Sequence, residues 1–434
     1  MNELTLGQKV RKARLEKNFS QSELVGTFIT RNMLSKIEND SANPSLKTIE
    51  YLAEKLEKPI SYFLDNSIVI ENRKKNSIEL AFEHSTYLFK NKEYDDCITY
   101  ISNMLKEYDC STDKISYPRI LSILGRCYVY TNKSEDAQKA FEECIKLLEI
   151  NKDYYYLIVS YLNLGYIYFN NNRFEDAKKS SRKAIELLSN SHIDNELVEI
   201  KLYYVLGYSL FEQQRYIEAI PPLLYSLDIS KEYNCFYNAG NIHMLLGLVY
   251  ERNNDIKKAI YHTQKSIAFY DFTEKYGLKA ASQKNLGNYY IAEGNYSDAK
   301  LYLSESMKYY ENTNNQLKVN TIKSDIVEVL TKEEKYTDAI NFSEEVDIDI
   351  IKDADKASVY KNLGKCYIYL NEYSKAENYL NKALKVLEKN EKPNILYDTY
   401  TFLAELYSLT DDFKKAYEFS NKSKEVLKGS ISHS

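Results

Sequence analysis

The chain has 434 residues, 44% of them apolar, but only 12 glycines, 6 prolines and no tryptophan. Glycine and proline together reach about a third of their usual share in soluble proteins, whereas a β-rich or α/β chain of this length needs many tight turns. We therefore expect an all-α fold in which short polar connections join the helices. The other departure from average composition is the 42 tyrosines.

The net charge of −5 comes from 58 basic and 63 acidic side chains and predicts no general attraction to nucleic acid. Residues 1–36 depart from this average, because they hold seven basic and three acidic side chains. The six cysteines are far apart and form no CxxC pair, so we interpret them as reduced thiols rather than a disulfide framework or zinc site. The sequence shows no apolar signal core and no membrane-spanning stretch. We expect a cytoplasmic protein without a membrane partner.

The first 66 residues contain five short helical patterns, at about 6–18, 20–26, 30–39, 45–57 and 60–65. Ser20 and Glu23 form a capping box at the start of the second, Thr30 is a suitable N-cap for the third, and Pro44-Ser45 opens the fourth. Two short helices joined by a tight turn inside a five-helix unit are typical of a helix-turn-helix. We expect a DNA-binding domain over 1–66 and a linker over 67–77.

Three motifs within residues 4–65 resemble the lambda-repressor/Cro-type DNA-binding domain. They are Ser20-Gln21-Ser22-Glu23-Leu24, Leu34-Ser35-Lys36-Ile37-Glu38-Asn39 and Asn43-Pro44-Ser45-Leu46. The resemblance implies that the DNA-contacting side chains are Gln21, at the head of the second helix, and Thr30, Arg31, Asn32, Ser35 and Lys36 on the recognition helix. Their chemistry agrees, since Arg and Lys suit guanine, Asn suits adenine, and Ser or Thr suit either a base edge or phosphate. The resemblance also implies a buried, structural ion pair between Arg14 and Glu38.

A second pattern repeats about every 40 residues from residue 78 onward. Leu-Gly dipeptides end at Gly125, Gly165, Gly207, Gly247, Gly287 and Gly364, and an alanine follows twelve residues after each glycine. Three weaker copies place Ser85, Val327 and Ala404 at the glycine position, which gives nine units. An aromatic residue three before the alanine marks the turn between the two helices of most units. The pattern resembles tetratricopeptide repeats, and it predicts a right-handed superhelical solenoid of about nine helix pairs over 78–434.

The combination of these two regions resembles the RRNPP-type peptide-pheromone regulators, the PlcR/NprR-like group. That resemblance implies a cytoplasmic, homodimeric quorum-sensing transcription regulator that binds double-stranded promoter DNA. It also implies control by a short linear signalling peptide bound in the concave groove of the repeats, in a domain that also mediates dimerisation.

In repeats of this kind the groove is lined by first-helix positions six, three and two before the glycine and one after it. The side chains at these positions include Arg119, Arg126, Asn163, Tyr166, Lys201, Asn241, Lys284, Asn285, Asn288, Lys361, Asn362 and Lys365. A carboxamide can both donate to and accept from an extended peptide backbone. Arg and Lys suit a carboxylate, and a tyrosine packs against apolar peptide side chains.

The sequence contains no catalytic motif, and its five histidines are scattered without metal-ligand spacing. We therefore expect no enzymatic activity, no metal and no cofactor. Three alternatives remain open. The repeats sequester a response regulator or another protein, with DNA binding secondary; the helix-turn-helix serves protein contacts; or the chain is a scaffold with a vestigial N-terminal domain.

Overall fold

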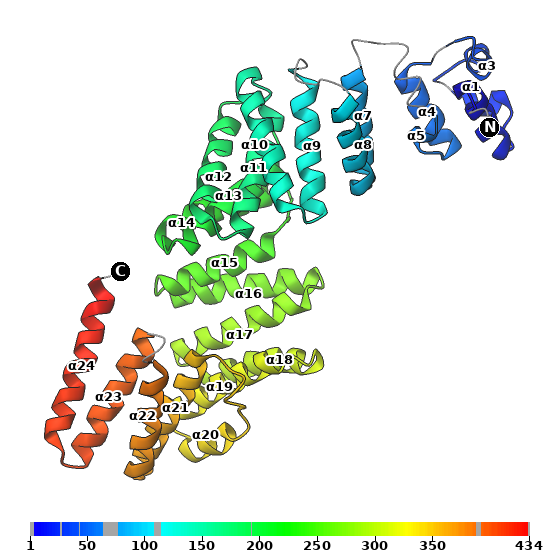
Figure 1. Ribbon diagram of the computed structural model, residues 1–434. Coiled ribbons are helices and arrows are strands. Elements are labelled where there is room, and N and C mark those ends of the chain that lie inside the picture. Colours follow the sequence, from blue (N-terminus) through cyan, green and yellow to red (C-terminus); the bar gives the residue numbers. More distant parts are fainter. Residues whose placement is uncertain are drawn as a thin grey trace. The chain divides into compact units, whose positions relative to one another are not determined.

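The computed structural model describes residues 4–26, 28–42, 44–63, 77–107, 114–191, 193–387 and 392–432. Within these residues every regular element is a helix, as predicted (Figure 1). The chain divides by its internal contacts into two compact units, Met1–Ile167 and Tyr168–Ser434. The predicted linker over 67–77 lies outside the described residues except for Ser77.

Five short helices form the N-terminal region, close to the predicted ranges. They are α1 (Leu6–Glu16), α2 (Gln21–Val25), α3 (Arg31–Glu38), α4 (Leu46–Leu56) and α5 (Ile60–Phe63). Ser20 and Glu23 form the predicted capping box at the start of α2. The Thr30 side chain caps α3 by accepting from the backbone of Met33, and Ser45 caps α4. The local signals in the sequence therefore fixed the helix starts correctly.

A small apolar core holds these five helices together. The α1 residue Gly7 is buried against α3, and a Cβ at this position would clash with the backbone carbonyl of Ile37. The Gly7 amide also donates to Asp40 Oδ1 at 2.8 Å. The α1–α3 contact is thus fixed through backbone as well as side chains. The core side chains are Leu6, Val10, Ala13, Leu24, Ile29, Leu34, Ile37, Ile49, Leu52, Ala53, Leu56 and Phe63.

The rest of the described chain consists of successive helix pairs, one for each predicted repeat. The pairs are α7 (Ser77–Lys90) and α8 (Tyr94–Glu107), α9 (Ser116–Tyr130) and α10 (Ser134–Asn151), α11 (Tyr154–Asn170) and α12 (Phe174–Ser189), α13 (Glu196–Glu212) and α14 (Tyr216–Glu232), α15 (Ala239–Arg252) and α16 (Ile256–Phe272), α17 (Tyr276–Glu293) and α18 (Tyr296–Asn312), α19 (Gln316–Lys332) and α20 (Tyr336–Ser343), α21 (Asp353–Tyr369) and α22 (Tyr373–Leu387), and α23 (Pro393–Leu409) and α24 (Phe413–Ser432). The first helix of each pair carries the predicted anchor residue.

The anchor glycines allow the two helices of a pair to approach closely, as the pattern predicted. A Cβ added at any of five anchors would lie closer than 3.0 Å to the side chain sixteen residues later, on the second helix. For Gly364 that side chain is Leu380, whose Cγ would be 2.5 Å away. The alanine twelve residues after the anchor is fully buried in most units, as for Ala376. The five anchors tested are Gly125, Gly207, Gly247, Gly287 and Gly364.

The turn inside each pair has a fixed form. The aromatic residue three before the alanine is the first residue of the second helix in seven pairs, namely Tyr94, Phe174, Tyr216, Tyr296, Tyr336, Tyr373 and Phe413. In all nine pairs the backbone is left-handed two residues before the second helix, and Asn fills this position four times, because Asn tolerates positive φ better than most residues. Some of the tyrosines stack between repeats: the Tyr94 ring lies 4.5 Å from Tyr130 and the Tyr336 ring 5.0 Å from Tyr369.

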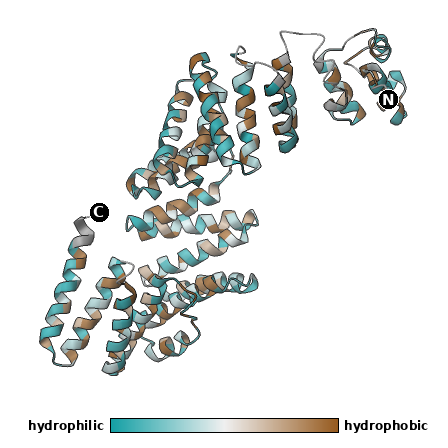
Figure 2. Cartoon of the chain, in the orientation of Figure 1, coloured by the Kyte–Doolittle hydropathy of each residue, from teal (hydrophilic) through white to brown (hydrophobic). Residues whose placement is uncertain are grey.

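Apolar packing continues from repeat to repeat within the second unit. One cluster of buried side chains runs from Ile200 on α13 to Val329 on α19, and the helices concerned carry interleaved hydrophobic and hydrophilic residues (Figure 2). The seventh pair is irregular. Its second helix α20 ends at Ser343, and Val346 and Ile351 in the following segment supply the buried side chains instead.

Candidate DNA-binding and ligand-binding sites

Helix α3 presents a polar face to solvent. Arg31, Asn32 and Lys36 are exposed and Ser35 is half-buried, while Leu34 on the opposite face is fully buried. Thr30 is exposed as well, and its Oγ1 accepts a hydrogen bond from the Met33 amide at 3.2 Å. The predicted recognition residues therefore share one accessible surface, which is the geometry that reading a DNA groove requires.

Arg14 and Glu38 form the buried ion pair expected at the base of this surface. The Arg14 Nε–Glu38 Oε1 distance is 2.6 Å and the Nη2–Oε2 distance is 3.0 Å, and the two residues are 9% and 5% exposed. Arg14 Nη1 also donates to the Phe19 carbonyl at 2.7 Å. The hydrogen bond to Glu38 raises the pKa of Arg14, so the guanidinium stays charged. The structural interpretation of this pair is confirmed.

Gln21 is connected to that pair. Its Nε2 donates to Glu38 Oε2 at 2.8 Å and its side chain is half-buried. Gln21 thus supports the position of α3, and its contact with DNA remains a prediction. The sequence interpretation missed two accessible apolar side chains nearby, Phe28 and Met33. Phe28 is 53% exposed and stacks on Tyr51, with ring centroids 5.2 Å apart.

Four of the predicted peptide-binding residues lie on α9 and α11. Arg119 Nε is 2.7 Å from Asp153 Oδ2, and Arg126 lies over the Phe89 ring at 4.0 Å from its centroid. Asn163 Nδ2 donates to a carbonyl of its own helix, and Tyr166 is half-buried. Both arginines therefore already have partners in the structure, and a ligand carboxylate would have to share or replace them.

Two more lie on α13 and α15. Lys201 Nζ is 4.8 Å from the ring centroid of Tyr237. Asn241 accepts a hydrogen bond from the Tyr270 hydroxyl at 2.5 Å and donates to Asn238. Both the oxygen and the nitrogen of this carboxamide form hydrogen bonds within the protein, so Asn241 has a structural role in addition to any contact with a ligand.

Helix α17 carries three predicted residues, Lys284, Asn285 and Asn288. Lys284 Nζ lies 3.2 Å from Asp325 Oδ2 on α19. Asn288 is half-buried, and its Oδ1 has no hydrogen-bond donor among the described residues. Burial raises the pKa of Asp325 to about 6, and Lys284 opposes that rise.

The last three predicted residues lie on α21. Lys361 is 6% exposed and its Nζ is 3.2 Å from Asp398 Oδ2 on α23. Asn362 is 3% exposed, and its Nδ2 finds no acceptor in the described part of the chain. Lys365 Nζ lies 5.7 Å from the centroid of the Phe402 ring.

Two acidic groove residues, Asp325 and Asp398, escaped the sequence interpretation. Asp325 stands two residues before Val327 and Asp398 six residues before Ala404, both groove positions in the repeat frame. The repeat frame could have located both residues, but they lie in two of the degenerate units, whose anchor residues are not glycine. The groove positions therefore combine lysine–aspartate pairs with carboxamides.

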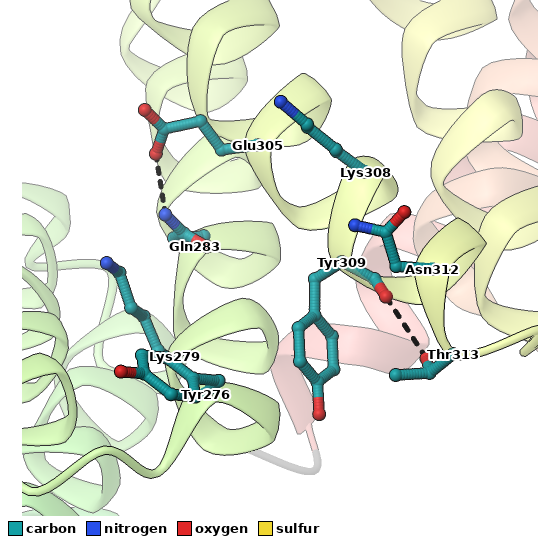
Figure 3. A pocket seen from close by; sticks show the side chains of 8 residues that line it. All are labelled: Tyr276, Lys279, Gln283, Glu305, Lys308, Tyr309, Asn312 and Thr313. Atoms are coloured by element: carbon teal, nitrogen blue, oxygen red, sulfur yellow. Dashed lines mark hydrogen bonds between the residues drawn. The ribbon is translucent and has the colours of Figure 1, made fainter.

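A surface cleft of about 520 Å³ lies between α17 and α18, and none of the predicted residues lines it. Tyr276 and Lys279 on α17 face Lys308 and Tyr309 on α18 across it (Figure 3). Gln283 Nε2 bridges the two helices by donating to Glu305 Oε2 at 2.5 Å. The cleft mixes charged, amide and phenol groups, and no residue pattern in the sequence marks it.

Two of the histidines that looked scattered meet in the structure. The Nδ1 atoms of His243 on α15 and His262 on α16 are 2.9 Å apart, and burial lowers the pKa of each to about 4. Across the residues that the structure describes, no group of three or more His, Cys, Asp or Glu side chains is arranged to hold a metal ion. Cys97, Cys127, Cys144 and Cys366 are buried free thiols.

None of the helices in the described part of the chain combines the length and apolar character that crossing a membrane requires.

Comparison with known families matches residues 10–63 to the helix-turn-helix family. Residues 118–147, 158–188 and 357–390 match tetratricopeptide repeats. The first match covers the five short N-terminal helices, and the others cover helix pairs of the repeats. The matches identify the N-terminal region as a helix-turn-helix and the later regions as tetratricopeptide repeats.

Among curated proteins, the chain is 19% identical over 282 residues to response regulator aspartate phosphatase I of Bacillus subtilis (strain 168). The match covers 65% of this chain and only 64% of the length of that phosphatase.

Two solved structures are similar in fold. The apo form of the quorum sensor NprR from B. thuringiensis is 16% identical, with a TM-score of 0.58, over 82% of this chain and 100% of that one. A signal-transduction ATPase with a tetratricopeptide-repeat sensor from Pyrococcus horikoshii is 14% identical, with a TM-score of 0.53, over 99% of this chain and 73% of that one. The chain therefore joins a helix-turn-helix domain to tetratricopeptide repeats, the architecture of the RRNPP-type regulators that its sequence resembles.

Proposed function

We propose that the chain is a transcription regulator that binds promoter DNA through α3 and is controlled by a short peptide bound to the first helices of its repeats. The observation that carries this proposal is the presence in one chain of two sets of polar side chains, one exposed and one largely buried. One is the exposed face of a well-braced recognition helix, and the other is a series of incompletely paired polar side chains on repeat helices. A scaffold would need neither.

The DNA-binding half rests on the chemistry of α3. Arg31 and Lys36 suit the acceptors of guanine and Asn32 suits adenine, while the Arg14–Glu38 pair fixes the helix beneath them. One such helix covers a single half-site. We therefore propose a homodimer whose two recognition helices read half-sites about 34 Å apart or a multiple of that distance.

The peptide-binding half rests on the groove residues of the repeats. Asn288 Oδ1 and Asn362 Nδ2 have no hydrogen-bond partner among the described residues, and such amide atoms pair with an extended backbone whatever the side chains are. Lysine–aspartate pairs such as Lys284–Asp325 and Lys361–Asp398 add charge selection. Peptide binding would alter the curvature or assembly of the repeats, and with it the spacing of the two recognition helices. We propose that the protein acts in the cytoplasm, where its proposed peptide ligand and its DNA target meet, and that it is not an enzyme.

The test is a DNA footprint measured on promoter fragments with and without short candidate peptides. We expect saturable peptide binding and a footprint that changes in extent or occupancy as the peptide is added. Asn285→Ala on α17 should lose the peptide response but retain the basal footprint. Asn378→Ala, an exposed position on the second helix α22, is the matched control. A footprint indifferent to every peptide would contradict the proposal.

A second candidate function is favoured by the similarity to response regulator aspartate phosphatase I. In this alternative the repeats dock a response regulator, and DNA binding is secondary. Pull-down of phosphorelay proteins by the full chain tests it. Retention of a response regulator, lost on addition of a peptide, would show that the two roles coexist.

A further inference from the structure

One groove residue of the repeats is a buried carboxylate that the fold leaves only partly paired. The Asp325 side chain is 15% exposed, and Lys284 Nζ lies 3.2 Å from its Oδ2. Apart from this ion pair, Oδ2 has no hydrogen-bond donor among the described residues. A buried carboxylate normally accepts several hydrogen bonds, because burial without them is costly.

Apart from Lys284, the charged side chains that influence the pKa of Asp325 are negative. Glu328 on the same helix and Asp355 on α21 both act to raise its pKa, and burial is the largest cause of the rise. Lys332 pairs with Glu328 at 3.5 Å, and the Thr321 hydroxyl donates to Asp355 at 3.2 Å. Lys284 is therefore the one basic side chain that pairs with Asp325 among the described residues, and a further positive group would stabilise the site.

Two amide atoms without a hydrogen-bond partner among the described residues lie at predicted groove positions on the helices that follow and precede α19 in the stack, α21 and α17. Helix α19 contacts both α17 and α21, and the Lys284–Asp325 pair joins predicted groove positions of α17 and α19. Asn288 on α17 offers an unpaired acceptor, and Asn362 on α21 offers an unpaired donor at the same repeat position as Asp325. Three successive repeats thus present an acceptor, a carboxylate and a donor. An extended peptide backbone supplies the partners for both amides.

We infer that the peptide bound by the repeats carries a positively charged group that pairs with Asp325, while the amides of Asn288 and Asn362 hold its backbone. This inference rests on the proposed peptide-binding function and names the chemical class of its ligand. In the unbound protein Lys284 partly neutralises Asp325. In the complex the ligand cation supplies the missing donors to the carboxylate.

The cation can be the N-terminal ammonium of the peptide or a lysine or arginine side chain. Both provide N–H donors and a positive charge to a carboxylate. Four synthetic pools of short peptides separate these sources, each with the other basic residues excluded. Two pools contain one lysine at a fixed position, and the other two contain norleucine, which has no charge, at that position. In each pair of pools, one has a free N-terminus and the other is N-acetylated.

The experiment measures the retention of each pool on the immobilised full chain by mass spectrometry. We expect a cation-bearing pool to be retained at least about ten-fold better than the acetylated norleucine pool, as for other buried charge pairs. The acetylated lysine pool identifies a side-chain cation, and the free norleucine pool an N-terminal one. Asp325→Asn, which keeps shape and removes charge, should abolish the difference between pools but not retention itself.

The matched control is Asp271→Asn, which breaks the exposed ion pair with Lys279 on the neighbouring repeat and should leave the preference unchanged. Retention of all four pools without a charge preference would overturn this inference and leave peptide control standing. An equal preference in the Asp325→Asn protein would also overturn it. Retention of no pool would overturn both the inference and the proposed function.

Discussion

Two ion pairs in this chain, one buried and one half-buried, differ in how completely their carboxylates are hydrogen-bonded. In the helix-turn-helix, Glu38 receives hydrogen bonds from Arg14 Nε, Arg14 Nη2 and Gln21 Nε2. In the repeats, Asp325 has one ion pair, with Lys284, and no further donor to Oδ2 among the described residues. The first pair is completed by the fold, whereas the second is left for something else to complete.

The difference follows from the cost of burying charge. Desolvation of two ions is repaid only when the geometry is good and the remaining lone pairs are satisfied. The bidentate Arg14–Glu38 arrangement meets that condition, and breaking it leaves an uncompensated charge. Asp325 does not meet it, so its ionised form is a local destabilisation that the fold tolerates. We therefore expect opposite stability effects when the two carboxylates are removed.

The largest effect is expected from Glu38→Ala. It leaves the Arg14 guanidinium buried without its partner, which costs about 3–5 kcal/mol of unfolding free energy. Hydrogen exchange of the full chain would show the loss of protection confined to the helices within residues 4–63. The control Glu54→Ala removes an exposed carboxylate from α4. Unchanged protection in the Glu38 variant would mean that the pair is not structural.

Asp325→Asn should stabilise the repeats near neutral pH. Burial raises the pKa of Asp325 from 3.8 to about 6, so the folded protein binds a proton that the unfolded chain releases between these values. Stability from this group is therefore present at low pH and is lost as the pH rises through about 6. The gain in the variant should reach at most about 3 kcal/mol above that pH and vanish below about pH 4.

Denaturant unfolding of both proteins across this pH range measures the difference. Asp271→Asn, on an exposed pair, should change stability little at any pH. A destabilised Asp325 variant at neutral pH would show that the Lys284 contact already satisfies the carboxylate. That result would remove the contrast between the two pairs.

A third comparison uses the Leu-Gly dipeptide that both regions contain. A methyl group at Gly7 would meet the backbone carbonyl of Ile37, whereas one at Gly364 would meet the Leu380 side chain. Backbone cannot move as readily as a leucine rotamer. We expect Gly7→Ala to lie near the upper end, and Gly364→Ala near the lower end, of the roughly 1–3 kcal/mol typical of overpacking.

Thermal unfolding of each variant, with Gly277→Ala as the control, would rank the three. The nearest atom to a Cβ at the control position would be the Tyr309 hydroxyl, at 3.1 Å, which is the free end of a side chain. If Gly364→Ala were the most destabilising, the anchor glycines would be more rigidly packed than the static distances indicate.

The sequence was sufficient for the helices because their signals are local. Ser20 and Thr30 cap the helices that they were predicted to cap, Ser45 caps the helix that Pro44-Ser45 was predicted to open, and the small anchors lie where two helices approach. The repeat frame also placed the candidate groove residues on first helices. These features depend on spacing along one or two neighbouring helices, which a single sequence displays directly.

Side-chain partners could not be predicted in the same way. Asp325 was missed because its repeat has a valine anchor, and the contact with Lys284 joins residues 41 positions apart. His243 and His262 meet across a helix pair, although no spacing rule for metal ligands connects them. Such contacts depend on the rotation of one helix against another, and a one-residue change in that rotation would separate the groups.

The smallest stability effect is expected from Arg31→Ala, and that is what makes it informative. The side chain is exposed at the first turn of α3 and is not part of the apolar core of the N-terminal helices, so stability should change by less than about 0.5 kcal/mol. Truncating an arginine that reads a base should nevertheless cost about 1–3 kcal/mol of DNA affinity, measured by titrating a promoter fragment at fixed salt.

The control is Lys257→Ala, which removes one exposed positive charge from α16. Arg31 would then contrast with Glu38 beneath the same surface. Arg31 would contribute to DNA affinity but not to folding stability, whereas Glu38 would contribute to folding stability without contacting a base. Equal DNA affinity for the two variants and the native chain would mean that α3 does not read DNA.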